Sequence, residues 1–239
     1  MEQNLSKKTR TESDLIGSRE VPESALYGVQ TLRGIENFRI SKFHLNEYPL
    51  FIQALAITKM GAAVANRELD LLTEEQTDAI LRACKEILEG KHHEQFPVDM
   101  IQGGAGTTTN MNINEVVANR ALELMGHQRG EYQYCSPNDH VNRSQSTNDA
   151  YPTAIHIGLY YTHLKLVKHF EVLIEAFRKK GSEFAHIIKM GRTQLEDAVP
   201  MTLGQTFNGF ASILEHEVKN LDFAAQDFLT VNMGATAIG

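Results

Sequence analysis

Residues 152–190 read PTAIHIGLYYTHLKLVKHFEVLIEAFRKKGSEFAHIIKM, and this stretch decides the fold. After Pro152 it contains no proline, and only Gly158 and Gly181 interrupt its helical pattern. Its apolar residues recur mostly three, four or seven positions apart, at Leu159, Leu166, Phe170, Leu173, Phe177, Phe184 and Ile187. The spacing predicts one helix from Pro152 to about Met190, roughly 55 Å long at about 1.5 Å per residue.

A second segment of the same kind follows Pro200. Its apolar positions recur at similar intervals, at Phe207, Phe210, Leu214, Leu221 and Phe228. Helices this long with narrow apolar seams cannot bury those seams alone, so they need partner helices within the chain or from other subunits. The two segments therefore predict an all-α helix bundle and an oligomeric protein.

The chain before residue 146 predicts shorter elements. We expect helices at about residues 49–69, 73–90 and 112–126, of which the second starts with a capping box of Thr73 and Gln76. The last is expected to follow Asn112, and residues 17–48 read as irregular. The predicted organisation is a flexible tail at residues 1–16, a small N-terminal helical domain at 17–145 and part of a central helix-bundle domain at 146–239.

The composition excludes several classes of protein. The formal net charge is −7 and no long basic run could neutralise phosphates, so we expect no binding to nucleic acid. No apolar run reaches the ~20 residues that span a bilayer, so we expect no membrane segment. Two cysteines, Cys84 and Cys135, are too few for a disulfide framework, which favours the cytoplasm. The ten histidines lack the spacing of zinc sites, and we expect no metal or other cofactor.

Three polar loops could carry chemistry. The first, residues 102–112, reads QGGAGTTTNMN; its glycines let backbone approach a ligand, and its donors are Thr107, Thr108, Asn110 and Asn112. The alternative interpretation is a turn followed by a helix cap. Because the loop lacks the Lys-Ser/Thr ending of a P-loop, nucleotide binding is not favoured.

The second loop, residues 144–153, reads SQSTNDAYPT and leads into the long helix. Proline suits the first turn of a helix, where backbone N–H groups and the helix dipole attract anions. Ser146, Thr147 and Asn148 add side-chain donors there, which predicts a carboxylate site. Helix capping is the alternative. The third loop, residues 191–200, contributes the cation Arg192 or is simply an interhelical turn.

Together the loops offer many neutral donors and few titratable groups. Such a set suits the stabilisation of a developing oxyanion better than the activation of a nucleophile. His140 lies near the second loop, either as a supporting group of the site or as a structural hydrogen-bonding residue.

Several motifs, in this order, make the chain resemble the aspartase/fumarase superfamily, and within it the aspartases (aspartate ammonia-lyases). They are Val21-Pro22, YGVQTLR at 27–33, GAGT at 104–107, GEYQY at 130–134, PNDHVN at 137–142, STND at 146–149 and GRTQ at 191–194. The similarity runs from about Gly17 to Gly239.

The resemblance implies a small N-terminal domain, a central domain of long helices and a C-terminal domain. It implies a homotetramer in which each active site borrows loops from three subunits. It also implies a dicarboxylate substrate and the reversible elimination of ammonia from L-aspartate to fumarate, through an aci-carboxylate intermediate. A class II fumarase, or a non-catalytic scaffold of the same fold, is the alternative.

The resemblance also implies roles for individual residues. Thr107 would lie near the amino and β-carboxylate groups of the substrate. Ser146, Thr147 and Asn148 would bind a carboxylate and the amine, and Thr193 and Gln194 would hold the other carboxylate. Fumarases usually have histidine at the position of Gln194 and two serines at that of Ser146-Thr147, so both places favour an aspartase.

The family's base is a serine in a downstream Gly-Ser-Ser loop that this sequence does not contain. We therefore expect a truncated chain, in which no residue up to Gly239 is the catalytic base and which is inactive alone.

Overall fold

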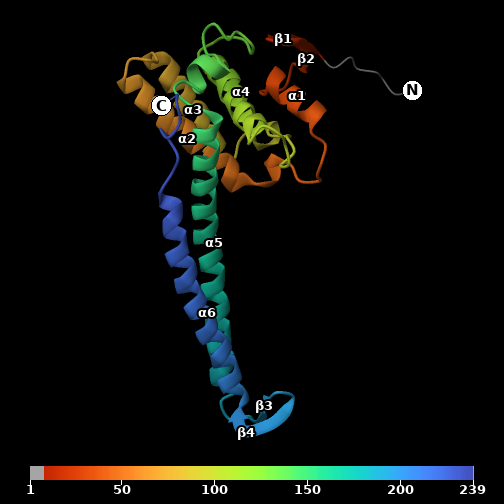
Figure 1. Ribbon diagram of the computed structural model, residues 1–239, viewed down its shortest axis with the longest axis vertical. Coiled ribbons are helices and arrows are strands. Elements are labelled where there is room, and N and C mark those ends of the chain that lie inside the picture. Colours follow the sequence, from red (N-terminus) through yellow and green to blue (C-terminus); the bar gives the residue numbers. More distant parts are fainter. Residues whose placement is uncertain (1–7, 239) are drawn as a thin grey trace, which may run out of the picture. The chain divides into compact units, whose positions relative to one another are not determined.

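The computed structural model describes residues 8–238, which form two compact units (Figure 1). Unit 1 comprises residues 8–158 and 231–238, and unit 2 comprises residues 159–230. The α-helices of the described residues are α1 (Val29–Asn37), α2 (Pro49–Glu68), α3 (Glu74–Leu88), α4 (Thr107–Leu124), α5 (Thr147–Glu183) and α6 (Leu203–Ala225). The prediction of a mainly helical fold is confirmed. The two compact units divide within α5, after Gly158. This division does not test the domain boundary expected at residue 146, which stays a prediction.

Short elements precede, connect and follow these helices. They are η1 (Leu45–Glu47), η2 (His93–Gln95), the π-helix η3 (Pro137–Val141), η4 (Gln226–Leu229), and two antiparallel pairs of strands, β1 (Thr9–Asp14) with β2 (Gly17–Pro22) and β3 (Ile188–Thr193) with β4 (Glu196–Thr202). The helices of this part of the chain include none that is both long and apolar enough to cross a membrane.

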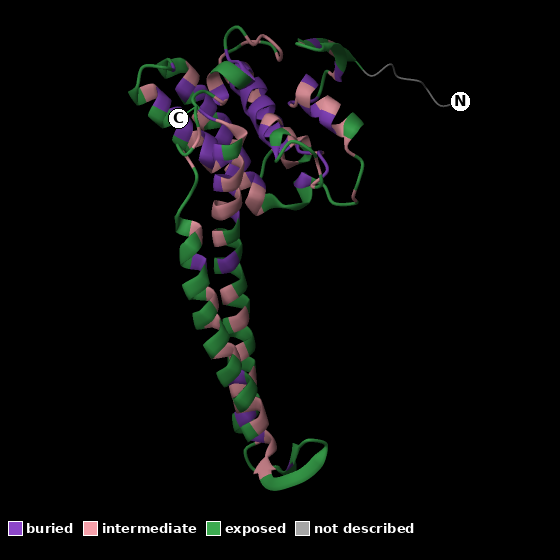
Figure 2. Cartoon of the chain, in the orientation of Figure 1, coloured by how far each residue is buried: buried purple, intermediate pink, exposed green. Residues whose placement is uncertain are grey.

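The core of unit 1 lies between α2, α3 and α4 (Figure 2). Side chains such as Leu55, Ile80 and Ile113 are fully buried there. Each such side chain stabilises the folded state by about 1.5–3 kcal/mol through removal of apolar surface from water. The expected helices at 49–69 and 73–90 are confirmed as α2 and α3. Pro49 is the first residue of α2, and Thr73 and Gln76 form the expected capping box of α3. These start signals are local, which is why the sequence alone revealed them.

The segment expected to be irregular contains α1, which is held by a carboxylate distant in sequence. Glu115 of α4 accepts backbone N–H groups of Gly28 (2.8 Å), Gln30 (2.8 Å) and Thr31 (3.0 Å) at the start of α1. Burial raises the pKa of Glu115 to about 7, although the N–H groups lower it. An anion here complements the positive end of the helix dipole. Because α4 begins at Thr107, Glu115 lies in the interior of this helix.

The expected tail at residues 1–16 is only partly described, since residues 1–7 lie outside the described part. Where it is described, Thr9–Asp14 pairs with Gly17–Pro22 as a hairpin. Arg10 anchors this hairpin by donating to the carbonyl oxygens of Ala25 (2.7 Å) and Tyr27 (2.8 Å). Three charge-assisted bonds of this kind, including one to Pro22, explain why polar residues form an ordered strand here.

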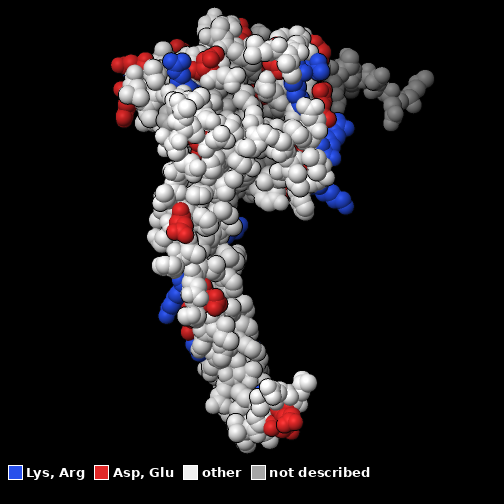
Figure 3. Space-filling model, in the orientation of Figure 1, with Lys and Arg blue, Asp and Glu red and all other residues white. Residues whose placement is uncertain are grey.

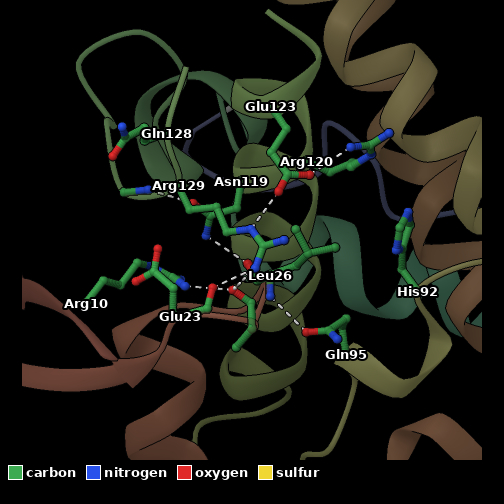
Figure 4. Close-up of polar contacts among 12 residues, drawn as sticks. Arg10, Glu23, Leu26, His92, Gln95, Asn119, Arg120, Glu123, Gln128 and Arg129 are labelled. Atoms are coloured by element: carbon green, nitrogen blue, oxygen red, sulfur yellow. Dashed lines mark hydrogen bonds and ion pairs between the residues drawn. The ribbon is translucent and has the colours of Figure 1, made fainter. Parts of the chain in front are cut away.

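The loop that follows β2 is fixed by polar side chains of unit 1 (Figure 4). Asn119 donates to the carbonyl oxygen of Leu26 (2.8 Å), and the Leu26 N–H donates to Gln95 (2.8 Å). Arg129 donates to Glu123 (2.7 Å) and to the carbonyl oxygen of Glu23 (2.7 Å). These contacts give a segment without regular structure the hydrogen bonds that its backbone needs.

In unit 2, the C-terminal part of α5 and α6 run antiparallel, as their contacts require. His163 contacts Asp222 (2.9 Å) near one end of the pair, and Arg178 binds Glu215 (2.8 Å) further along. Phe177, Phe184, Phe207 and Phe210 form a cluster of rings with centroids 5.6–6.3 Å apart. These four phenylalanines belong to the seams that the sequence predicted, so part of each seam pairs within the chain.

The long helix differs from its prediction at both ends. It begins at Thr147 instead of Pro152, which lies inside it, and it ends at Glu183 instead of Met190. Residues 188–202 form a hairpin, because Pro200 suits a strand edge better than a helix interior. The N–H groups of Leu203 and Gly204 donate to the carbonyl oxygens of Ile187 (2.8 Å) and Phe184 (3.0 Å), which satisfies the start of α6.

Many residues of unit 2 are exposed (Figure 2), and large apolar side chains are among them. Between 42% and 61% of the surface is exposed at each of the apolar residues Leu159, Leu166, Leu173, Phe210 and Ile213. On the face drawn in Figure 3, charged side chains are sparse along α5 and α6. Exposed apolar side chains in this number indicate a surface that packs against a partner.

Two glycines of α6 should respond in opposite ways to alanine. A Cβ on Gly204 would collide with the carbonyl oxygen of Gly181 and the backbone of Ala185, whereas a Cβ on Gly209 meets nothing within 4 Å. Gly204→Ala should therefore lower the free energy of unfolding by about 1–3 kcal/mol. Gly209→Ala should raise it by about 0.5–1 kcal/mol, because alanine loses less backbone freedom in a helix. Urea unfolding followed by circular dichroism measures both, and equal effects would contradict this packing.

Candidate functional site

The candidate carboxylate site lies at the first turn of α5. Ser146 caps the helix: its carbonyl oxygen accepts the N–H groups of Asp149 (3.0 Å) and Ala150 (3.1 Å), and its hydroxyl accepts that of Asn148 (3.2 Å). Asp149 accepts the Ser146 N–H in return (2.8 Å). Ser146, Thr147 and Asn148 thus sit on the positive end of a 37-residue helix. Both interpretations of these residues, capping and donation to an anion, are compatible with this geometry.

The glycine-rich loop meets this helix end. Gly106 has a φ of +91°, and a side chain there would run into the ring of Tyr151 in the first turns of α5. Only glycine combines this backbone conformation with so close an approach. The first and second polar loops are therefore in direct contact.

The helix after the glycine-rich loop begins earlier than predicted. It starts at Thr107 rather than after Asn112, so the four expected donors are themselves helical. Asn110 is the one that reaches the second loop: its Nδ2 donates to Thr147 Oγ1 (3.2 Å) and to Asn142 Oδ1 (3.1 Å). The error arose because Asn112, which resembles a cap, is a buried interior residue.

The other predicted donors of this loop have different surroundings. Thr107 is exposed and its hydroxyl donates to the carbonyl oxygen of Gly104 (2.6 Å). Thr108 is half-buried and its methyl group lies beside Gly34. Asn112 is fully buried and donates to the carbonyl oxygen of Gln95 (3.0 Å), which favours a structural role. Their part in binding stays a prediction.

His140 belongs to the π-helix η3 and is held by its own turn. Its Nδ1 accepts the N–H of Ser136 (2.7 Å), and burial lowers the pKa of the imidazole. A neutral ring with an occupied Nδ1 supports the structural interpretation of this histidine more than a proton-transfer role.

Sequence reasoning missed the residue at the centre of these loops. Lys59 of α2 is fully buried, and its Nζ donates to Asn110 Oδ1 (2.7 Å), Asn142 Oδ1 (3.0 Å) and Gln145 Oε1 (2.9 Å). Burial lowers the pKa of the amine to about 7, whereas the three acceptor oxygens favour the charged form. The signal was present in the sequence: Lys59 falls on the apolar stripe of α2, four residues after Leu55 and three before Ala62.

The third predicted loop lies in unit 2. Arg192 and Thr193 end β3, and Gln194 and Leu195 form the two-residue turn with φ values of +44° and +69°. The side chains of this turn are exposed. Two left-handed residues match the twist of a tight hairpin. The meeting of Arg192, Thr193 and Gln194 with the loops of unit 1 stays a prediction.

Asp149 connects the helix end to the last part of the described chain. Its Oδ2 accepts the hydroxyl of Thr236 (2.7 Å) as well as the Ser146 N–H. The side chain is 1% exposed, and its Oδ1 has no hydrogen-bond partner among residues 8–238. Since this carboxylate already occupies one side of the helix end, an incoming anion depends more on the hydroxyl and amide donors of Thr147 and Asn148.

An open groove of about 910 Å³ elsewhere in unit 1 is a weaker candidate. It is lined in part by Tyr27, Glu123, His127 and Arg129, and Arg129 and Glu123 already pair with each other (2.7 Å). The candidate donors do not line it. In the described part of the chain, no three His, Cys, Asp or Glu side chains are grouped so that they could hold a metal ion.

The glycine-rich loop is pinned at its start by Asp99. Its carboxylate accepts the N–H groups of Ile40 (2.8 Å), Ser41 (2.6 Å) and Ile101 (2.8 Å) and the Ser41 hydroxyl (2.7 Å). The Ser41 N–H and its companions lower the pKa of Asp99 to about 2. Gln102 holds the next turn by accepting the Thr109 N–H (2.8 Å). The loop therefore has fixed ends.

Residues 17–239 match the model of a protein family described as Lyase, and the chain belongs to this lyase family. An aspartate ammonia-lyase of Pseudomonas canavaninivorans is 58% identical over 96% of the chain and 49% of its own length. The chain thus spans about half the length of the curated relatives it matches.

Solved structures of two organisms share the fold. A fumarate lyase:delta crystallin of Brucella melitensis in native form is 51% identical with a TM-score of 0.93, covering 96% of this chain and 54% of that one. A class II fumarase of Schistosoma mansoni is 36% identical with a TM-score of 0.88, covering 97% of this chain and 49% of that one.

The lowered pKa of Asp99 predicts how the stability of the fold depends on pH. A carboxyl group whose pKa is lowered on folding contributes stability that is present above its unfolded pKa, near about 4, and is lost as the pH falls through about 2. Asp99→Asn should therefore be less stable at neutral pH and should lose less stability than the wild type on acidification. The urea midpoint, measured from pH 7 down to the lowest pH at which the chain folds, checks this.

The matched control is Asp78→Asn, at an exposed position of α3. Its pH profile should follow that of the wild type. Parallel profiles for Asp99→Asn and the wild type would contradict the proposed anchoring.

Proposed function

We propose that the protein is an aspartate ammonia-lyase, which catalyses the reversible elimination of ammonia from L-aspartate to give fumarate. The observation that carries the proposal is the contact of Asn110 with Thr147 at the first turn of α5, where neutral donors gather on a helix N-terminus. The 58% identity to an aspartate ammonia-lyase, against 36% to the class II fumarase, supports the choice of reaction.

The chemistry explains why neutral donors suit this reaction. Removal of the proton next to the β-carboxylate of aspartate creates an aci-carboxylate, which carries one more negative charge than the carboxylate did. Hydroxyl and amide donors that are already in place bind this charge more strongly than the ground state, which lowers the barrier. Thr147 and Asn148 cannot exchange protons with the intermediate at neutral pH, so the base is a different group.

We also propose that substrate binding requires several subunits of a homotetramer in the cytoplasm. The exposed apolar side chains of unit 2, among them Leu166, Leu173 and Ile213, would be covered by equivalent helices of other copies. In that arrangement Thr193 and Gln194 of one copy would hold one carboxylate while Ser146, Thr147 and Asn148 of another hold the second. The exposed turn at Gln194 supports this, because its side chains are not used within unit 2.

Steady-state kinetics test the reaction. The protein expressed from its complete gene should convert L-aspartate to fumarate, detected by ultraviolet absorbance, and should consume fumarate only when ammonium is supplied. Consumption of fumarate without ammonium would instead identify a fumarase. Absence of both reactions, together with absence of succinate binding in calorimetry, would identify a non-catalytic scaffold.

The donor role of Thr147 predicts a specific loss. Thr147→Val keeps the shape of the side chain but removes the hydroxyl, so KM for aspartate should rise about 10- to 100-fold, the usual cost of a hydrogen bond to a charged group. The matched control is Thr153→Val, six residues further along α5, where the buried hydroxyl has no hydrogen-bond partner among the described residues. The control should keep its KM, and an unchanged KM for Thr147→Val would contradict the assignment.

A further inference from the structure

Lys59 of α2 has its ammonium group fully enclosed by three side-chain amide oxygens. An ammonium group has three donors and no acceptor, and the oxygens of Asn110, Asn142 and Gln145 at 2.7–3.0 Å take one each. A neutral amine has only two donors, and its lone pair would face the third oxygen. The set of partners is therefore specific for the charged form. Such a charge is unusual in a core, because burying it is costly unless every donor is used.

The charge on Lys59 sets the orientation of the Asn110 side-chain amide. With Oδ1 bound to Lys59, the Nδ2 group must point away from the cation, and it reaches Thr147 Oγ1 at 3.2 Å. The reverse orientation would bring N–H donors against the ammonium. Because Thr147 Oγ accepts the amide proton, its own O–H is left to be donated elsewhere, for example to an anion at the helix N-terminus.

Lys59 also fixes the backbone that enters α5. Asn142 Nδ2 donates to the carbonyl oxygen of Gln145 (3.0 Å), and Gln145 Nε2 donates to that of Val141 (3.0 Å). Both amides take their orientation from the lysine through their oxygens. The turn that leads into Ser146 is therefore set by the same group as the hydroxyl of Thr147.

We propose that Lys59 is a positioning residue of the lyase site, which fixes the Asn110 amide so that the Thr147 hydroxyl donates to the substrate carboxylate. The inference rests on the proposed function and adds a residue that touches no substrate. The titratable group that faces the lysine is Cys84 of α3, whose thiol is kept neutral because burial raises its pKa to about 12. The cation thus acts on the site through Asn110 and not through an ion pair.

A purely supporting role would look different, and α2 offers a residue that has one. Asn66 lies two turns after Lys59 and is 3% exposed. It holds the same loop, since it donates to the carbonyl oxygen of Arg143 (2.9 Å) and accepts the hydroxyl of Ser144 (2.9 Å). Within the described residues its hydrogen bonds do not extend to Asn110 or Thr147. Asn66→Ala is therefore the matched control.

The test compares succinate binding by calorimetry, KM for aspartate and thermal unfolding in the full-length protein. Lys59→Met should raise the Kd of succinate and the KM about 10- to 100-fold. Asn66→Ala should lower the unfolding temperature about as much as Lys59→Met does. Its Kd for succinate and its KM for aspartate should stay near those of the wild type. An unchanged Kd in Lys59→Met, or an equal rise in both variants, would overturn the proposal. A wild type that neither binds succinate nor forms fumarate would instead refute the proposed function.

A second variant covers the case in which Lys59→Met does not fold. Asn110→Asp keeps an oxygen for Lys59 and gives it an ion-pair partner, so the fold is retained. It replaces the donor to Thr147 by an acceptor, and the hydroxyl then turns away from the substrate. The Kd of succinate should again rise about 10- to 100-fold, and a Kd like that of the wild type in this folded variant would overturn the proposal.

Discussion

The ammonium of Lys59 binds three amide oxygens that come from residues 51, 83 and 86 positions later in the chain. A buried charge is tolerated only when all its hydrogen bonds are made, so α2, α4 and the turn after η3 must be in place together. Loss of any partner would leave a charge without compensation in the core. The geometry of Asn110 and Thr147, and with it the candidate site, depends on this one group.

Carboxylates play the same part for the other irregular segments of unit 1. Glu115 gathers the N–H groups at the start of α1, and Asp99 gathers those of residues 40, 41 and 101. Each anchors backbone that has no partner in a helix or sheet, and apart from Ile101 the anchored residues are distant in sequence from the carboxylate. The loops around the site therefore have fixed conformations, which a site that binds charge by neutral donors requires.

The sequence predicted best what local signals control. The limits of α2 and α3 followed from Pro49, from the Thr73–Gln76 capping box and from apolar spacing, all within a few residues of each end. The starts of α4 and α5 were misplaced, because Asn112 and Pro152 look like helix starts while their surroundings make them interior residues. The hairpin at residues 188–202 was missed because Phe184 and Ile187 continue the helical spacing of the preceding segment.

The sequence by itself determined the helical class, the polar loops and the membership of the lyase family, since each depends on residue types and short spacings. It also named Ser146, Thr147 and Asn148 as candidate donors. Only the tertiary structure decided that Asn110 reaches Thr147 while Asn112 does not, and that Lys59 is enclosed. The physical reason is that the state of a buried polar group depends on partners brought together by folding. The sequence shows where the lysine is in the chain, but it does not show which oxygens surround it in the folded protein.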